Sequence, residues 1–221
     1  MGQKVHPIGF RVGVTRKQDS RWYANKKNFG RFLVEDHKIR GHIKKVLGFA
    51  GIPKIEIERT EDEIEIVIHA ARPGVVIGRR GAEVDKVRDD IAAITGSSKV
   101  NIRIQEVHKP ELSARLVAEG IVEQLEKRTN TRRAMKKAME TCVAAGVLGM
   151  KIQCSGRLGG AEIARQEKAR IGSVPCQKLN ADVDFGIAEA STTMGRIGVK
   201  VWLYKGDFAE SMEEVTDGAH A

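Results

Sequence analysis

The residues best suited to binding chemistry are Gly78-Arg79-Arg80-Gly81, two arginines held between two glycines. Glycine has no Cβ atom, so the backbone can turn sharply there and come close to a ligand. Each guanidinium group carries a fixed positive charge and five N–H donors. The apolar pattern that follows predicts a helix, whose free N–H groups would point toward the same place. The natural ligand for this loop is a phosphate group.

A second basic stretch runs from Lys127 to Lys137 and contains six cations and no acid. Thr131 is expected to cap a helix, with Met135, Ala138, Met139 and Cys142 on its buried side. Arg132 and Lys136 are then four residues apart, as are Arg133 and Lys137, so the charges form a ridge. Like charges at this spacing repel one another and cost stability. The ridge is therefore interpreted as a nucleic-acid contact rather than as a solvated face.

The order of the elements around the glycine loop supports a specific fold. Patterns of apolar residues predict a helix at 36–47, strands at 54–59, 63–69 and 99–106, and two helices flanking the loop. A GxxG loop alone is weak evidence, because a plain turn between helices would also explain it. With the order α-β-β-α-α-β, it is typical of a type II KH module, which clamps about four nucleotides of a single strand.

The remaining sequence predicts a second domain and two charged ends. Residues 109–206 are expected to place two helices on a small, mainly antiparallel sheet, so the fold class is α+β. Residues 1–35 are interpreted as a basic arm that orders on a partner, residues 36–108 as the KH domain, and residues 207–221 as an acidic, disordered tail. Further contacts with RNA are expected at basic residues of the arm and of the second domain: Lys4, Arg11, Arg16, Lys17, Lys127, Arg128, Lys137, Arg157 and Arg165.

Composition narrows the kind of partner. The 221 residues include 38 Lys and Arg against 29 Asp and Glu, a net charge of +9, which favours a polyanion. Cys142, Cys154 and Cys176 show no CxxC spacing, so neither a metal site nor a cofactor is expected. The chain has no apolar run near eighteen residues and no GxxxxGK[ST] loop, so we expect no transmembrane helix and no ATP-binding site.

Several longer motifs resemble the family of bacterial small-subunit ribosomal protein three. They include Met1 to Pro7, Ala71 to Gly78, Lys109 to Leu112, Arg132 to Lys136, Ser155 to Arg165, Glu189 to Thr193 and Ile197 to Trp202. The resemblance extends over nearly the whole chain to about Lys205. It implies a cytoplasmic, ribosome-bound protein of the small-subunit head that binds ribosomal RNA and takes no small-molecule substrate.

The same resemblance implies specific neighbours and a specific role. Members of the family adjoin ribosomal proteins ten and fourteen, and with proteins four and five they line the channel where messenger RNA enters. The positions matching Arg132, Arg133 and Lys136 face that channel and are implicated in opening messenger-RNA helices. Some relatives carry a long basic C-terminal extension, whereas this chain ends in an acidic segment, so the tail is not expected to contact RNA.

Two other classes of function are compatible with parts of the sequence. A free KH protein, acting transiently in ribosome assembly or transcription, would need the loop but not the basic arm and the second ridge. An enzyme, either an autonomous helicase or a nucleic-acid lyase, would need a P-loop or a lysine in an apolar pocket, and the sequence indicates neither.

Overall fold

The computed structural model describes residues 4–60, 63–78, 81–96 and 99–208, and its contacts divide the chain into two compact units. One unit spans Gln18–His108, and the other combines Met1–Lys17 with Lys109–Ala221. The expected arm at 1–35 is therefore not a separate part of the structure. Its first half belongs to the C-terminal unit, and its second half belongs to the KH unit. The part of the acidic tail beyond residue 208 lies outside the described residues.

The first unit has the α-β-β-α-α-β order expected from the sequence, preceded by a short strand. Its elements are β1 (Ser20–Arg21), α2 (Lys26–Leu47), β2 (Lys54–Arg59), β3 (Ile64–Ala70), α3 (Pro73–Ile77), α4 (Ala82–Thr95) and β4 (Val100–Glu106). The strand order is β1-β2-β3-β4, with β2 and β3 antiparallel and β3 and β4 parallel.

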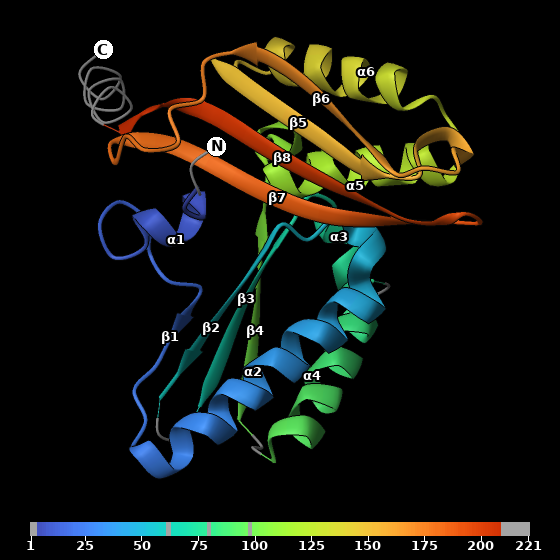
Figure 1. Ribbon diagram of the computed structural model, residues 1–221. Coiled ribbons are helices and arrows are strands. Elements are labelled where there is room, and N and C mark those ends of the chain that lie inside the picture. Colours follow the sequence, from blue (N-terminus) through green and yellow to red (C-terminus); the bar gives the residue numbers. More distant parts are fainter. Residues whose placement is uncertain (1–3, 61–62, 79–80, 97–98, 209–221) are drawn as a thin grey trace, which may run out of the picture. The chain divides into compact units, whose positions relative to one another are not determined.

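Alternating isoleucines explain why this sheet has one covered face. Ile57, Ile66 and Ile68 are fully buried, whereas the alternate positions, such as Glu56, Glu65 and Val67, are only partly buried. Period-2 alternation turns all the apolar side chains of a strand to the same side. Ile39 and Ile43 of α2 and residues of α4 complete the core, and Figure 1 shows both helices along one face of the strands.

Helix α2 begins at Lys26, ten residues before the expected start near Asp36. A polar cluster holds this extension to the sheet. The Asp36 carboxylate accepts hydrogen bonds from Trp22 Nε1 at 2.8 Å and from the guanidinium of Arg59 at 2.7 Å. Arg59 also bonds Glu35 at 2.7 Å, so the buried acids are fully paired. The sequence did not predict the start at Lys26, because tertiary contacts stabilise the first turns of α2 and a local sequence pattern does not show such contacts.

The second unit is a four-stranded sheet with two long helices. It contains α1 (Pro7–Arg11), α5 (Ala114–Glu126), α6 (Thr131–Ala144), β5 (Gly149–Gly156), β6 (Arg165–Gly172), β7 (Ala181–Thr192) and β8 (Gly195–Asp207). The strand order is β6-β5-β8-β7, and every neighbouring pair is antiparallel. This arrangement confirms the expectation of two helices on a mainly antiparallel sheet. Strand β6 and helix α1 were not expected.

One face of this sheet carries the core. Met150, Ile152, Val199 and Val201 are fully buried with the apolar residues of α5 and α6. Helix α5 approaches β7 so closely that a Cβ atom at Gly186 would lie 2.3 Å from the carbonyl oxygen of Ala114. The sheet thus fixes the start of α5 and, through the short α5–α6 connection, the position of the basic stretch.

Candidate nucleic-acid interface

The glycine loop of the KH unit joins two helices. Gly78 ends α3 with a φ of 68°, and its N–H donates to the carbonyl oxygen of Gly74 at 3.1 Å. Gly81 precedes α4 with a φ of 84°. Both values lie in the left-handed region, where a Cβ atom is costly. Arg79 and Arg80, the expected phosphate ligands, lie outside the described residues, and their role stays a prediction.

The first turn of α4 is acidic. Glu83 pairs with Lys86 at 3.1 Å, and Asp85 pairs with Arg88 at 3.0 Å. Carboxylates at a helix N-terminus stabilise the helix by interacting with its dipole, but they also reduce the attraction of the same end for a phosphate. Binding at this loop would therefore depend on the two arginines more than on the helix end.

The basic ridge of the second unit stands on α6 with its charges turned to solvent. Asn130, not Thr131, caps the helix, because its side-chain oxygen accepts from the N–H of Arg132 at 3.0 Å. Thr131 is the first residue of the helix and is buried. The cations of the ridge are all exposed: Arg132, Arg133, Lys136 and Lys137. The expected inward positions Met135 and Cys142 are buried, so the register of this helix was predicted correctly.

Two adjoining hollows connect this ridge with more distant basic residues. One, of about 490 Å³, is lined by Arg128, Arg132, Arg165 and Gly159, among others. The other, of about 430 Å³, is lined by Arg128, Arg157 and the loop at 192–194. Arg128 has a φ of 59° and, among the described non-glycine residues, is alone in the left-handed region. The fold thus gathers four of the predicted RNA contacts around the beginning of α6.

Acidic neighbours reduce the charge of some of these residues. Arg132 Nε lies 3.4 Å from Glu167 Oε1, Lys136 Nζ lies 3.9 Å from Glu140, and Lys127 Nζ lies 2.6 Å from Glu123. In the described part of the chain, Arg128, Arg133, Lys137, Arg157 and Arg165 form no ion pair. Exposed pairs contribute little energy and separate easily, so all these cations remain able to contact phosphates.

Two of the predicted RNA contacts in the N-terminal segment have a structural role. The guanidinium of Arg11 is buried and donates to the carbonyl oxygens of Pro7, Pro175, Lys178 and Ala181. Arg16 pairs with Asp184 at 3.2 Å, and Asp184 also accepts from the N–H of Ala114 at 2.9 Å. The burial of Arg11 corrects the expectation for this residue, which attaches the segment to the C-terminal unit. Arg16 makes a second attachment but is partly exposed, so its contact with RNA stays a prediction.

Lys4 and Lys17 lie on the surface, as a contact with RNA would require. Their role stays a prediction, because exposure alone does not distinguish a contact from a solvated side chain.

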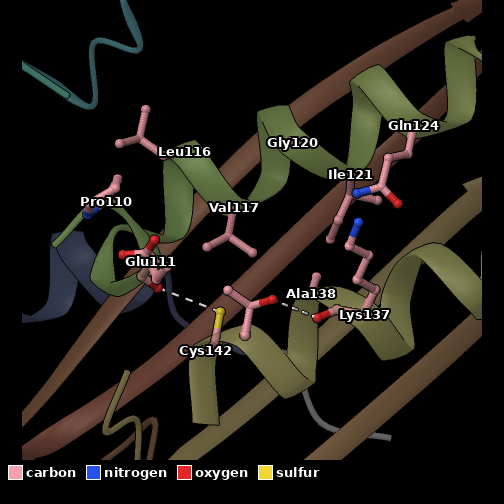
Figure 2. Close-up of a pocket in the computed structure, with 11 residues that line it drawn as sticks. Pro110, Glu111, Leu116, Val117, Gly120, Ile121, Gln124, Lys137, Ala138 and Cys142 are labelled. Atoms are coloured by element: carbon pink, nitrogen blue, oxygen red, sulfur yellow. Dashed lines mark hydrogen bonds between the residues drawn. The ribbon is translucent and has the colours of Figure 1, made fainter. Parts of the chain in front are cut away.

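The groove between α5 and α6 is apolar and differs from the basic hollows. It measures about 220 Å³ and is lined by residues such as Val117, Ile121 and Ala138. Figure 2 shows Lys137 and Gln124 at one end of it, and the Cys142 thiol directed at the carbonyl oxygen of Glu111, 3.5 Å away. Burial raises the pKa of the Cys142 thiol to about 11, so the thiol is protonated at neutral pH. An unreactive cysteine in an apolar groove offers no catalytic nucleophile.

Two features of the described residues bear on other classes of function. They contain no group of three or more His, Cys, Asp or Glu side chains that could hold a metal ion. No helix within the same ranges has the length and apolar character needed to cross a membrane.

The sequence did not single out Glu167, which is the carboxylate beside Arg132. This residue lies on the unexpected strand β6, where Glu167 and Ala169 face inward and Lys168 and Arg170 face outward. The side chains of β6 alternate between the two faces of the sheet, but few of its inward residues are apolar, so the usual signal of a strand is weak. The alternation of Glu167 and Ala169 with Lys168 and Arg170 is the one signal in the sequence that could have indicated this strand.

Family comparisons agree with the two-unit structure. Residues 38–112 match the model of the KH domain, and residues 121–203 match the model described as "Ribosomal protein S3, C-terminal domain". The chain belongs to the ribosomal protein S3 family. The resemblance seen in the sequence is thereby confirmed, as is the α+β fold with a KH unit. Proteins of this family are structural components of the ribosome, so the expectation that the chain is not an enzyme is confirmed by its family.

Three relatives illustrate how complete the match is. Each is named small ribosomal subunit protein uS3. The one from Caldicellulosiruptor saccharolyticus is 55% identical over 207 residues, which cover 94% of this chain and 93% of the relative. The one from Pelagibacter ubique is 50% identical over 218 residues, which cover 98% of this chain and 96% of the relative. The one from Clostridium botulinum strain Okra is 49% identical over 221 residues, which cover 100% of this chain and 99% of the relative. The similarity thus extends over both units and is not confined to the KH domain.

Proposed function

We propose that this protein is a permanent constituent of the small-subunit head, where it binds ribosomal RNA and presents the α6 ridge to messenger RNA at the entry channel. The observation that carries this proposal is the gathering of Arg128, Arg132, Arg157 and Arg165 around the beginning of α6. These residues come from two separate stretches of the sequence, Lys127 to Lys137 and Ser155 to Arg165. A merely solvated surface would have no reason to concentrate cations in this way.

The mechanism is electrostatic. Exposed guanidinium and ammonium groups bind phosphates irrespective of base sequence, and each contact releases a counterion. A ridge of this kind suits a messenger, whose sequence changes continuously. Arg132, Arg133 and Lys136 would hold separated strands, while translocation by the ribosome supplies the work. The neighbours expected on the ribosome are proteins ten and fourteen in the head and proteins four and five at the channel.

The competing proposal is a free KH protein in ribosome assembly or transcription. The two are distinguished by the stoichiometry of the protein on small subunits purified through a high-salt gradient. We expect about one copy per subunit. Protein that washes off, or that remains on a minor fraction of particles, would support the transient factor instead.

The position of the ridge is tested by photochemical crosslinking on assembled ribosomes. A messenger carrying 4-thiouridine downstream of the decoding site should crosslink to the peptide containing Arg132, Arg133 and Lys136. The matched comparison is the exposed pair Lys86 and Arg88 of the KH unit, which should not crosslink. Crosslinks absent from α6 would remove the entry-channel role and leave the structural role unaffected.

A further inference from the structure

The sheet of the C-terminal unit has a second face, turned away from α5 and α6, with an unusual composition. Register places Arg170, Lys151, Trp202 and Phe185 directly opposite one another in a single row across β6, β5, β8 and β7. The next row, two residues along each strand, contains Lys168, Gln153, Lys200 and Ile187. Neither row contains an acid. Four cations thus share one face with an aromatic pair.

The geometry of this face brings the cations close together. Neighbouring strands lie about 4.8 Å apart, and residues two apart on one strand are separated by about 7 Å. Lys151 Nζ lies 4.7 Å from the ring centroid of Trp202, and Trp202 packs against Phe185 at 5.1 Å. Burial, followed by the charges of Lys4, Lys168 and Arg170, lowers the pKa of Lys151. The positive charges on this face therefore repel one another.

No carboxylate compensates this charge. In the ranges that the structure describes, none of Lys151, Lys168, Arg170 and Lys200 forms an ion pair. Two other exposed cations of the unit, Lys127 and Arg196, do pair with carboxylates, those of Glu123 and Glu189. A row of unpaired like charges costs stability unless an anion binds to it. The face is therefore complementary to a polyanion.

The composition distinguishes an RNA ligand from a protein ligand. Protein–protein interfaces are depleted of lysine at their centres, whereas nucleic-acid interfaces are far more positively charged. Here three of the four cations are exposed, and Ile187 is the most exposed apolar side chain of the two rows. An aromatic ring among cations also suits single-stranded RNA, because bases stack on it without regard to sequence.

We infer that the outer face of this sheet, centred on Lys168, Arg170, Lys200 and Trp202, is a second RNA-binding surface that contacts a single-stranded segment through its phosphates. The C-terminal unit would then bind RNA on both of its faces. The inference does not depend on the proposal that α6 faces messenger RNA, since the two surfaces carry separate residues.

The test is the binding of the full-length protein to a fluorescent oligouridine over a range of salt concentrations. The variant K168Q/R170Q/K200Q removes three exposed cations and should bind less tightly. Single strands lose about 0.7 of log–log salt slope for each phosphate contact, so the slope should fall by about 2. The matched control, R31Q/R103Q/R196Q, removes three exposed cations that are ion-paired with Glu35, Glu65 and Glu189. The control should keep the slope of the unaltered protein.

A second measurement does not rely on these substitutions. In a Trp22→Phe background, Trp202 is the remaining tryptophan of the chain, and its emission should change on addition of oligouridine. An unchanged emission and an unchanged slope of the triple variant would overturn the inference. It would also be overturned if the triple variant lost binding to poly-glutamate but kept its binding to RNA, because the face would then be a protein contact. The triple R132A/R133A/K136A should leave the Trp202 signal intact, so failure of the α6 proposal would be recognised separately.

Discussion

Arg132 and Glu167 face each other across the α6–β6 contact, with Nε and Oε1 3.4 Å apart. Arg132 is 82% exposed, whereas Glu167 is 15% exposed. The carboxylate is therefore fixed in the sheet, and the guanidinium can move toward solvent. The pair reduces the charge of the ridge, and on the proposed function it should separate when an RNA phosphate competes for the arginine.

Replacing Glu167 with Gln should therefore strengthen RNA binding. An exposed ion pair contributes up to about 1 kcal/mol, so the affinity for single-stranded RNA at low salt should rise by roughly twofold to fivefold. Fluorescence anisotropy measures the change. The control, Glu189→Gln, releases Arg196 away from the ridge and should have a smaller effect. Equal affinity of E167Q and the unaltered protein would show that Glu167 does not restrain Arg132.

Replacing Arg11 with Ala should destabilise the C-terminal unit. The side chain is 1% exposed and connects α1 to carbonyl oxygens of the 175–181 segment, which would lose their donors. Loss of charged hydrogen bonds at a buried site should lower the free energy of unfolding by about 3 kcal/mol. Urea denaturation measures it, with Arg16→Ala as a milder comparison. Unchanged stability combined with weaker RNA binding would restore the original expectation that Arg11 contacts RNA.

Replacing Gly78 with Ala should distort the KH loop. Its φ of 68° is unfavourable for alanine, and the new Cβ atom would lie 2.6 Å from Cγ of Glu83. We expect a loss of about 1–2 kcal/mol in stability and weaker binding of single-stranded RNA. Gly81→Ala has a similar φ penalty but open space around the Cβ atom. If the contact with Glu83 matters, G78A/E83A should recover part of the loss; no recovery would leave the backbone angle as the sole cause.

The two buried thiols should react late and at high pH. Burial raises the pKa of Cys142 and of Cys154 to about 11, whereas Cys176 is half-buried. Iodoacetamide at neutral pH should therefore modify Cys176 first, as peptide mass spectrometry would show. Because the folded protein holds these two protons more tightly than the unfolded chain, the free energy of unfolding should fall as pH rises from about 9 to about 11. Rapid alkylation of Cys142 in the native protein would contradict this description.

The sequence predicted those parts of the fold that depend on local patterns. Ile64, Ile66 and Ile68 recur at every second position, with Glu65 and His69 among the residues of the other face, so the strand and its buried face followed directly. The register of α6 followed from Met135 and Cys142. The burial of Arg11 could not be predicted, because most of its partners are backbone carbonyls more than 160 residues away. Every residue has a backbone carbonyl, so the sequence does not show which of them will accept a hydrogen bond.

The outer face of the C-terminal sheet shows the same limit. Lys168 and Arg170 lie two residues apart on one strand, but Lys151, Lys200 and Trp202 come from strands far apart in the chain. Only the register of β6, β5 and β8 places them in neighbouring rows. The larger apolar residues of β7 include Phe185 and Ile187, yet Gly186, Ala188 and Ala190 face the helices after a bulge at Asp182 and Val183. Small residues are weak signals of a buried strand.

The measurement that tests the entry-channel role most directly compares translation of two messages by ribosomes carrying R132A/R133A/K136A. One message contains a stable hairpin in its coding region, and the other is unstructured. Removal of these charges should slow elongation through the hairpin by several-fold and should have little effect on the unstructured message. An equal effect on both messages, or no effect on either, would contradict a role of α6 in opening messenger-RNA structure.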